Sequence, residues 1–266
     1  MSLARSGKVV DLSPTLLQET GGPSSLLWLV NICRPSCGFC QGLEPRWQLL
    51  AKQLRHEVVV AHWDAAAYPE LPSMVGAANA TPTIRALQPT DDGIRNIDYR
   101  GAHVFEHLQH FAELMMPTFV AVVDSEDAWS RMARRANEEH LPVLLFVLRR
   151  GLNATTPRLL KALSSMWRNR LLITEVRLHA SVVGSAALVE SLGVDRTPSI
   201  LFMRDVRAPY RTVHYDGWPT IPGLNSFADE MMTDALQSTN SSVTEASVEN
   251  ALSSTAQRPG TFQDEL

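Results

Sequence analysis

The chain has 266 residues, of which 45% are hydrophobic and 20% are charged, and its formal net charge is −4. This is an ordinary globular composition, and because no block of Lys and Arg occurs, we expect no nucleic-acid partner. The longest apolar runs are far shorter than the roughly 20 residues of a transmembrane helix, so no membrane span is expected. The three cysteines, Cys33, Cys37 and Cys40, crowd into one short stretch, which excludes a framework of several disulfides.

The first half of the chain alternates between strand-like and helix-like segments. The sequence LLWLVNI at residues 26–32 is a continuous apolar run, which is typical of a strand buried on both faces. Leu43, Trp47 and Leu50 follow with helical spacing. In chain order we predict strands at 8–12 and 26–32, a helix at 43–54, a strand at 57–64, a short helix, strands at 81–87 and 96–101, and a helix at 103–115.

The second half repeats this scheme. Three pairs of short sequences match at a single separation of 116 residues. They are LWLVNI and VLLFVL, beginning at Leu27 and Val143; TPTI and TPSI, with Pro82 and Pro198; and IDYRG and VHYDG, with Tyr99 and Tyr215. The predicted elements are strands at 118–124, 143–148, 171–178, 199–203 and 212–217, and helices at 127–140, 157–169, 186–193 and 224–236.

Strands that alternate with helices of this length indicate an α/β fold in which a mixed sheet is flanked by helices. With the repeat, this predicts two domains, residues 1–116 and 117–236. Residues 237–266 are rich in Ser, Thr, Asn and Glu. Such a segment buries too little apolar surface to offset its ordering entropy, so we predict a disordered tail there.

The segment LWLVNICRPSCGFCQGLEPRW resembles the active-site stretch of the protein disulfide isomerases, and KVVDLSP, TPTI and YRG fit the same family. The resemblance covers the first copy well and the second only in outline. It implies two tandem thioredoxin-like domains. The sequence NATT at residues 153–156 stands where the first copy has its cysteine pair, so the second domain resembles the redox-inactive domains of that family.

The resemblance implies that Cys37 and Cys40 are the catalytic pair. At a helix start, free N–H groups and the positive end of the helix dipole favour a thiolate at Cys37, which attacks disulfides. Cys40 then resolves the mixed disulfide by attacking Cys37, and Gly38 and Phe39 keep the loop short enough for these two sulfurs to bond. A structural pair without chemistry and half of a zinc site are the alternatives. Cys33 is expected to be buried core, since free cysteine packs as a small hydrophobic residue.

Further residues are assigned by the same resemblance. Thr81 and Pro82 resemble the family's cis-proline turn, which faces the cysteine pair and offers backbone groups to an extended peptide. Asn31 stands where the family usually has a buried carboxylate that shuttles a proton from the inner cysteine. Phe39 replaces a histidine, and His103 stands in for an arginine whose charge it partly replaces. These departures predict a higher Cys37 pKa than in the family and a slower, more reducing site.

The predicted function is thiol–disulfide oxidoreductase, or protein disulfide isomerase, activity on cysteines of folding secretory proteins, with no cofactor and no metal. The predicted partners are unfolded or partly folded polypeptides and an ER oxidase or chaperone. One alternative is a largely redox-silent module that binds clients or joins a chaperone. Another is a cytosolic thioredoxin- or glutaredoxin-like reductase.

The two ends of the sequence give different indications of location. QDEL, at residues 263–266, resembles the retrieval tetrapeptide of the endoplasmic reticulum. The first residues, MSLARSGKVVDLSP, contain no secretory leader. The lumen of the endoplasmic reticulum is therefore predicted on condition that a leader precedes this start, and the cytoplasm otherwise.

Overall fold

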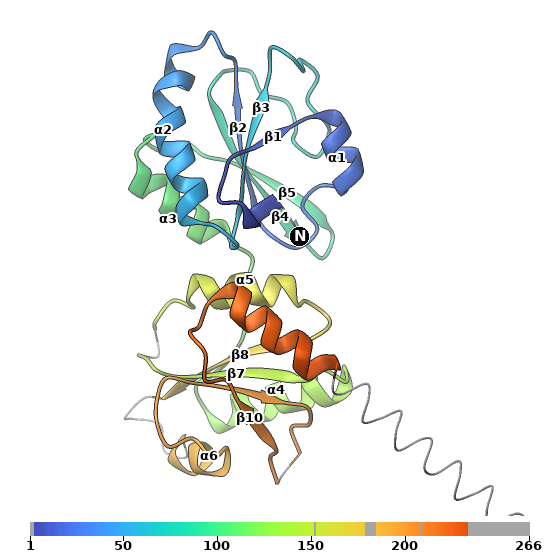
Figure 1. Cartoon of the computed structure of the whole chain (residues 1–266), viewed down its shortest axis with the longest axis vertical. Coiled ribbons are helices and arrows are strands. Elements are labelled where there is room, and N and C mark those ends of the chain that lie inside the picture. Colours follow the sequence, from blue (N-terminus) through green and yellow to red (C-terminus); the bar gives the residue numbers. More distant parts are fainter. Residues whose placement is uncertain (1–2, 152, 179–184, 208, 234–266) are drawn as a thin grey trace, which may run out of the picture. The chain divides into compact units, whose positions relative to one another are not determined.

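The chain contains two five-stranded sheets, one in each predicted copy (Figure 1). The computed structural model describes residues 3–151, 153–178, 185–207 and 209–233. Both sheets belong to one compact unit that ends at Gly223, and a second unit starts at Leu224. The domain boundaries at residues 116 and 236 remain predictions, and the predicted tail lies outside the described residues.

The first sheet has the strand order β1-β3-β2-β4-β5. Strands β1, β3 and β2 are parallel, whereas β4 is antiparallel to β2 and β5 is antiparallel to β4. After a short 3₁₀ helix at Leu3–Arg5, its elements are β1 (Val10–Leu12), α1 (Pro14–Thr20), β2 (Trp28–Cys33), α2 (Gly38–Gln53), β3 (Val59–Asp64), β4 (Thr83–Thr90), β5 (Gly93–Asp98) and α3 (Phe105–Met115).

Helices cover both faces of this sheet. Figure 1 shows α2 and α3 on one side and α1 on the other. All residues of the central strand β2 are buried, as its continuous apolar run predicts. On α2, the indole N–H of the fully buried Trp47 donates a hydrogen bond to the carbonyl of Ala61 in β3, at 3.0 Å. This contact fixes one face of α2 against the sheet.

Two local elements differ from those predicted. Helix α1 was not predicted. The Ser13 hydroxyl accepts a hydrogen bond from the Leu16 N–H, Pro14 starts the helix, and Gly21 ends it at a φ of 66°. These residues are the usual capping signals at the two ends of a helix. The predicted short helix after residue 64 is wrong, because residues 65–82 form turns and bends. Prolines that lack an N–H interrupt this segment and oppose a helix.

The second sheet repeats the first in order and direction. Its order is β10-β9-β7-β8-β6, with β6, β8 and β7 parallel and with β9 and β10 each antiparallel to its neighbour. Its elements are β6 (Ala121–Val123), α4 (Glu126–Glu138), β7 (Val143–Arg149), α5 (Arg158–Met166), β8 (Leu172–Leu178), α6 (Ser185–Ser191), β9 (Ser199–Met203) and β10 (Thr212–His214). Figure 1 shows α5 and α6 on opposite sides of this sheet.

Matched details confirm the repeat at the level of single residues. The hydroxyl of Tyr99 donates a hydrogen bond to the Ala102 carbonyl at 2.6 Å, and the hydroxyl of Tyr215 donates one to the Trp218 carbonyl at 2.9 Å. In both copies, a Cβ on the glycine two residues after the tyrosine would lie 2.5 Å from the tyrosine oxygen. Only glycine fits there, which explains the glycine in YRG and in YDG.

The predicted α/β class with two mixed sheets is therefore confirmed. A further helix begins at residue 221, three residues before the predicted start at 224, and continues to residue 233. Its predicted end at residue 236 lies outside the described residues. Within the described ranges, no helix is both long and apolar enough to cross a membrane.

Candidate active site

Cys37 lies at the N-terminus of α2, one turn after the central strand β2 ends. It is the N-cap residue of that helix, so its backbone is still extended. Two hydrogen bonds close the turn before it. The Cys37 N–H donates to the Arg34 carbonyl at 3.0 Å, and the side-chain amide of Gln41 donates to the Pro35 carbonyl at 2.9 Å. The predicted position of Cys37 at a helix start, with Cys40 one turn inward, is confirmed.

The helix start lowers the pKa of Cys37. The backbone N–H of Cys40 is the main cause, and it outweighs the partial burial of the sulfur, which raises the pKa. Hydrogen bonds from the Thr81 side chain and from the Phe39 N–H lower the pKa further. The thiol is partly exposed and is the free cysteine of the chain. A sulfur with these properties is a nucleophile that a substrate disulfide can reach.

The turn at Thr81–Pro82 faces this sulfur. The peptide bond between these residues is cis, as the resemblance implies, and the Cys37 sulfur lies 3.6 Å from the Thr81 carbonyl oxygen. Strand β4 starts at Thr83, which pairs with Ile32 at the end of β2. The antiparallel pairing of β2 with β4 thus brings together two segments that are far apart in the sequence.

The structure corrects the prediction for Cys33 and for the pairing of Cys40. A disulfide joins Cys33 to Cys40, with 5.9 Å between their Cα atoms, and it does not include Cys37. Both bonded residues are buried. The predicted burial of Cys33 is therefore confirmed, but its sulfur is bonded and is not that of a free cysteine. Cys40 lies on the buried face of α2, and this face is directed at the strand that ends in Cys33.

A signal for this pairing was present in the sequence. Cys40 falls in register with Leu43, Trp47 and Leu50, which are the residues that α2 buries. A helix buries such a stripe against its sheet. The sulfur of Cys40 therefore points inward, toward the end of β2, whereas Cys37 lies before the first helical turn.

Asn31 lies beside the disulfide. This residue of β2 is 1% exposed, and its Oδ1 atom is 3.1 Å from the Cys33 sulfur. In the reduced protein, a Cys33 thiol at this distance can donate a hydrogen bond to the amide oxygen. A neutral amide at this buried place accepts a hydrogen bond but takes up no proton, unlike a carboxylate.

The remaining predicted residues surround the same helix start or lie in the loop after β5. Phe39 is 82% exposed, although it is a large apolar side chain. Gly38 has no heavy atom within 4 Å of the position that a Cβ would take, so the approach to Cys37 is open on this side. The ring of His103 lies 6.3 Å from the ring of Tyr99, measured between centroids. The roles assigned to these residues remain predictions.

In the second domain, the segment between β7 and α5 and the strand β8 form a buried ionic cluster. The fully buried Glu175 of β8 accepts hydrogen bonds from Thr156 and Arg177 at 3.0 Å, and Arg150 lies 3.7 Å from the same carboxylate. Thr156 stands 116 residues after Cys40, but it precedes α5, which begins at Arg158, whereas Cys40 lies in the first turn of α2. The sequence has no cysteine after Cys40, so this domain has no thiol chemistry of its own.

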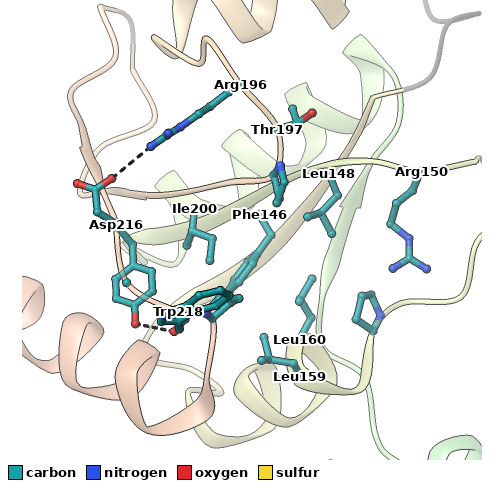
Figure 2. Close-up of a pocket in the computed structure, with 15 residues that line it drawn as sticks. Phe146, Leu148, Arg150, Leu159, Leu160, Arg196, Thr197, Ile200, Asp216 and Trp218 are labelled. Carbon is teal, nitrogen blue, oxygen red and sulfur yellow. Dashed lines mark hydrogen bonds and ion pairs between the residues drawn. The ribbon is translucent and has the colours of Figure 1, made fainter.

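A pocket of about 700 Å³ opens beside the second cis peptide bond, Thr197–Pro198. Figure 2 shows apolar side chains gathered at its centre and charged side chains at its margin. The apolar lining includes Phe146, Leu148, Leu159, Leu160 and Ile200, and the charged residues are Arg150, Arg196 and Asp216. The indole of Trp218 lies over the pocket and is 87% exposed. Sequence reasoning missed this pocket, because its residues come from four separate segments.

Among the described residues, no cluster of three or more His, Cys, Asp or Glu side chains is placed to hold a metal ion. The bond between Cys33 and Cys40 also leaves only Cys37 with an unbonded sulfur.

Comparisons with known proteins find relatives for the first part of the chain. A family model described as Thioredoxin matches residues 15–114. Protein disulfide-isomerase like 2-2 of Arabidopsis thaliana is 33% identical over 107 residues, which are 40% of this chain and 23% of the relative. Human protein disulfide-isomerase A6 is 33% identical over 101 residues, which are 38% of this chain and 22% of the relative.

Among solved structures, the crystal structure of ERdj5 form II aligns with 86% of this chain and 30% of its own, with 16% sequence identity and a TM-score of 0.47. The chain spans less than a quarter of the length of the two curated relatives. The matched region, residues 15–114, includes the helix start at Cys37 and the turn at Thr81–Pro82. Residues 15–114 are therefore similar to the thioredoxin family, and the curated relatives that match this part of the chain are protein disulfide isomerases.

Proposed function

We propose that the chain is a thiol–disulfide oxidoreductase that acts, through Cys37, on cysteines of unfolded or partly folded polypeptides. The single observation that carries this proposal is the partly exposed Cys37 sulfur at the start of α2, with its pKa lowered by the Cys40 N–H and with the Thr81 carbonyl 3.6 Å away. A thiolate is the reactive form of cysteine in disulfide exchange. Carbonyl and N–H groups at the turn beside it can pair with an extended peptide.

The proposed reaction is a pair of exchange steps. The Cys37 thiolate attacks one sulfur of a substrate disulfide, forms a mixed disulfide and releases the other substrate sulfur as a thiolate. A reduced Cys40 then attacks the Cys37 sulfur, so that a Cys37–Cys40 disulfide forms and the second substrate sulfur leaves as a thiolate. The substrate gains two electrons and the chain loses two. The reverse sequence of steps oxidises a substrate dithiol.

The site differs from the family pattern in ways that set its rate and potential. The buried Asn31 accepts no proton from a nearby thiol, and Phe39 supplies no positive charge next to Cys37. We propose a slower and more reducing site than one with a carboxylate and a histidine at these positions. QDEL at residues 263–266, which lies outside the described residues, supports action in the lumen of the endoplasmic reticulum.

The proposal is tested by replacing the attacking sulfur. Cys37→Ser is expected to abolish both the reduction of insulin in the presence of glutathione and the recovery of activity by scrambled ribonuclease. The exposed neighbour Ser36 serves as a matched control, because Ser36→Ala leaves every sulfur in place. Full activity in Cys37→Ser, with the far-ultraviolet circular dichroism of the parent chain, contradicts the proposal.

A second candidate function is client binding without redox chemistry, and the pocket beside Pro198 favours it. An exposed indole over an apolar pocket of this size is a docking site for an extended apolar segment of a partly folded polypeptide. Trp218→Ala is then expected to weaken the suppression of citrate synthase aggregation, whereas Cys37→Ser leaves it unchanged. Equal suppression by Trp218→Ala and the parent chain contradicts this role.

A further inference from the structure

The Cys40 residue contacts both other cysteines of the active site, through its disulfide to Cys33 and through its backbone N–H, which donates a hydrogen bond to the Cys37 sulfur. The bonded pair is not the pair that performs the proposed reaction. Cys40, which resolves mixed disulfides in that reaction, is bonded to Cys33. Cys37 keeps a free thiol. In this state Cys37 can still attack a substrate disulfide, but Cys40 cannot resolve the product because its sulfur is bonded to Cys33.

We propose that Cys33 is a third redox-active residue, which withdraws Cys40 from the resolving step and converts the site from a two-thiol to a one-thiol mechanism. This inference rests on the proposed oxidoreductase function. When Cys33 and Cys40 are bonded, Cys37 still attacks a substrate disulfide. The mixed disulfide then has no internal thiol to release it, and only a thiol of the client or a small thiol such as glutathione can do so.

The conversion needs no oxidant beyond the client disulfide. After one reaction cycle the chain holds a Cys37–Cys40 disulfide and a Cys33 thiol. The Cys33 thiolate attacks the Cys40 sulfur, so that the Cys33–Cys40 bond forms, the Cys37–Cys40 bond breaks and Cys37 leaves as a thiolate. One disulfide and one thiol are present before and after this exchange, and the proton lost by Cys33 goes to solvent or to Cys37.

Two features of the site favour this direction of exchange. The Cys37 pKa is lowered by the N–H groups at the helix start, and a thiol of low pKa is the better leaving group. The Cys33–Cys40 disulfide is almost fully buried, at 2% and 6% exposure, so external thiols reach it poorly. The reverse attack, by the Cys37 thiolate on Cys40, would expel Cys33 as a thiolate into this buried site, where the Asn31 oxygen, 3.1 Å from the sulfur, has no hydrogen to donate to it.

The two states give the site two activities. With Cys33 reduced, Cys40 releases the client and the site performs net reduction or oxidation. With Cys33 bonded to Cys40, Cys37 holds the client until another client cysteine attacks the mixed disulfide. The released client then carries a different disulfide, so this state favours rearrangement of disulfides in the client over their net reduction.

The first test maps the bond in the full chain. The chain is equilibrated in a mixture of oxidised and reduced glutathione, in which the reduced form releases any glutathione bound to Cys37. It is then desalted, and free thiols are blocked with N-ethylmaleimide in denaturant. Disulfides are then reduced and alkylated with iodoacetamide, and the labels are located by fragment mass spectrometry. We expect N-ethylmaleimide mainly on Cys37 and iodoacetamide on Cys33 and Cys40. N-ethylmaleimide mainly on Cys33 overturns the proposal.

The second test measures client release. A peptide with one cysteine, activated as a thiopyridyl disulfide, is joined to Cys37 of the oxidised parent chain and of reduced Cys33→Ala, and release is followed without added thiol. Cys33→Ala is expected to release the peptide at least about 100-fold faster, because its Cys40 attacks intramolecularly. Equal release by the two chains overturns the proposal. If the peptide joins neither chain, the proposed function fails, while the labelling pattern still decides the role of Cys33.

A third variant separates direct from relayed oxidation of the buried pair. In Cys37→Ser the Cys33–Cys40 bond can form only by direct reaction of a buried sulfur with oxidised glutathione. We expect its formation to be at least about tenfold slower than in the parent chain, because access limits attack on buried sulfur. Formation at the parental rate overturns the relay through Cys37. Circular dichroism of each variant establishes that it is folded.

Discussion

The Cys37 sulfur lies 3.6 Å from the carbonyl oxygen of Thr81, although 44 residues separate them in the sequence. The antiparallel pairing of β2 with β4 produces this proximity, because it places the start of β4 beside the end of β2. The helix start supplies N–H groups to the same sulfur from the other side. The reactive thiol is thus positioned by the sheet and activated by the helix.

The reactivity of Cys37 should follow a pKa below that of an ordinary cysteine. The Cys40 N–H stabilises the thiolate more than partial burial disfavours it, so deprotonation occurs at lower pH in the folded chain. We expect the rate of alkylation by iodoacetamide, measured from about pH 5 to pH 9 on the chain with Cys33 and Cys40 bonded, to rise at lower pH than in the same chain in urea. Coincident pH profiles would contradict the role of the helix start.

Phe39 should contribute to the binding of polypeptides and not to stability or to the chemical step. Its side chain is 82% exposed next to Cys37, so a client segment can cover it. If about 1 kcal/mol of apolar burial is lost, Phe39→Ser raises the KM for reduced, unfolded ribonuclease about fivefold. The rate with glutathione disulfide should not change, because this small substrate does not reach the ring. A parallel loss with both substrates would show instead that Phe39 acts on the thiol itself.

Asn31→Asp should make stability depend on pH. At 1% exposure, desolvation raises the pKa of the new carboxyl above its unfolded value of about 4. As pH rises, the carboxyl at position 31 therefore loses its proton at lower pH in the unfolded chain than in the folded chain. The free energy of unfolding falls as pH rises above about 4 and levels off beyond the folded-state pKa. We expect a cost on the order of 2 kcal/mol at neutral pH, measured by urea unfolding.

The control for this variant is Asn96→Asp, on the exposed edge strand β5. It should change the free energy of unfolding by less than about 0.5 kcal/mol, both at about pH 4 and at neutral pH. A pH-independent effect of Asn31→Asp would mean that its carboxyl is solvated and that the surroundings of Cys33 are not closed to water.

Gly101 and Gly42 should respond to alanine with opposite signs. A Cβ at Gly101 would lie 2.5 Å from the Tyr99 oxygen, whereas at Gly42, on α2, no heavy atom lies within 4 Å. Gly101→Ala therefore displaces Tyr99 from its hydrogen bond to Ala102 and should cost about 1–3 kcal/mol. Gly42→Ala should stabilise by about 0.5–1 kcal/mol, through helix propensity. Thermal unfolding of the two variants, compared with the parent chain, measures both signs.

The large-scale architecture could be predicted from the sequence because it rests on patterns that repeat. The separation of 116 residues between TPTI and TPSI relates two cis peptide bonds. The apolar runs at Leu27 and Val143 become the central strands β2 and β7. Burial on both faces leaves such segments few alternatives.

Features that depend on which side chains meet could not be predicted in the same way. The sequence around Cys33 is that of a buried strand and does not show that its sulfur is bonded. The bond depends on Cys40, whose side chain is directed from α2 toward the end of β2. Helix α1 was missed because its signals are the caps Ser13 and Gly21 rather than an apolar stripe. The pocket under Trp218 arises where separate segments converge, and no local pattern encodes it.

An odd number of sulfurs has a consequence of its own. Disulfides consume sulfurs in pairs, so whichever two of Cys33, Cys37 and Cys40 are joined, the third is left over. Because Cys33 and Cys40 are bonded, the cysteine that keeps a free thiol is the partly exposed Cys37. Even after complete oxidation within itself, the domain retains one point of covalent attachment for another molecule.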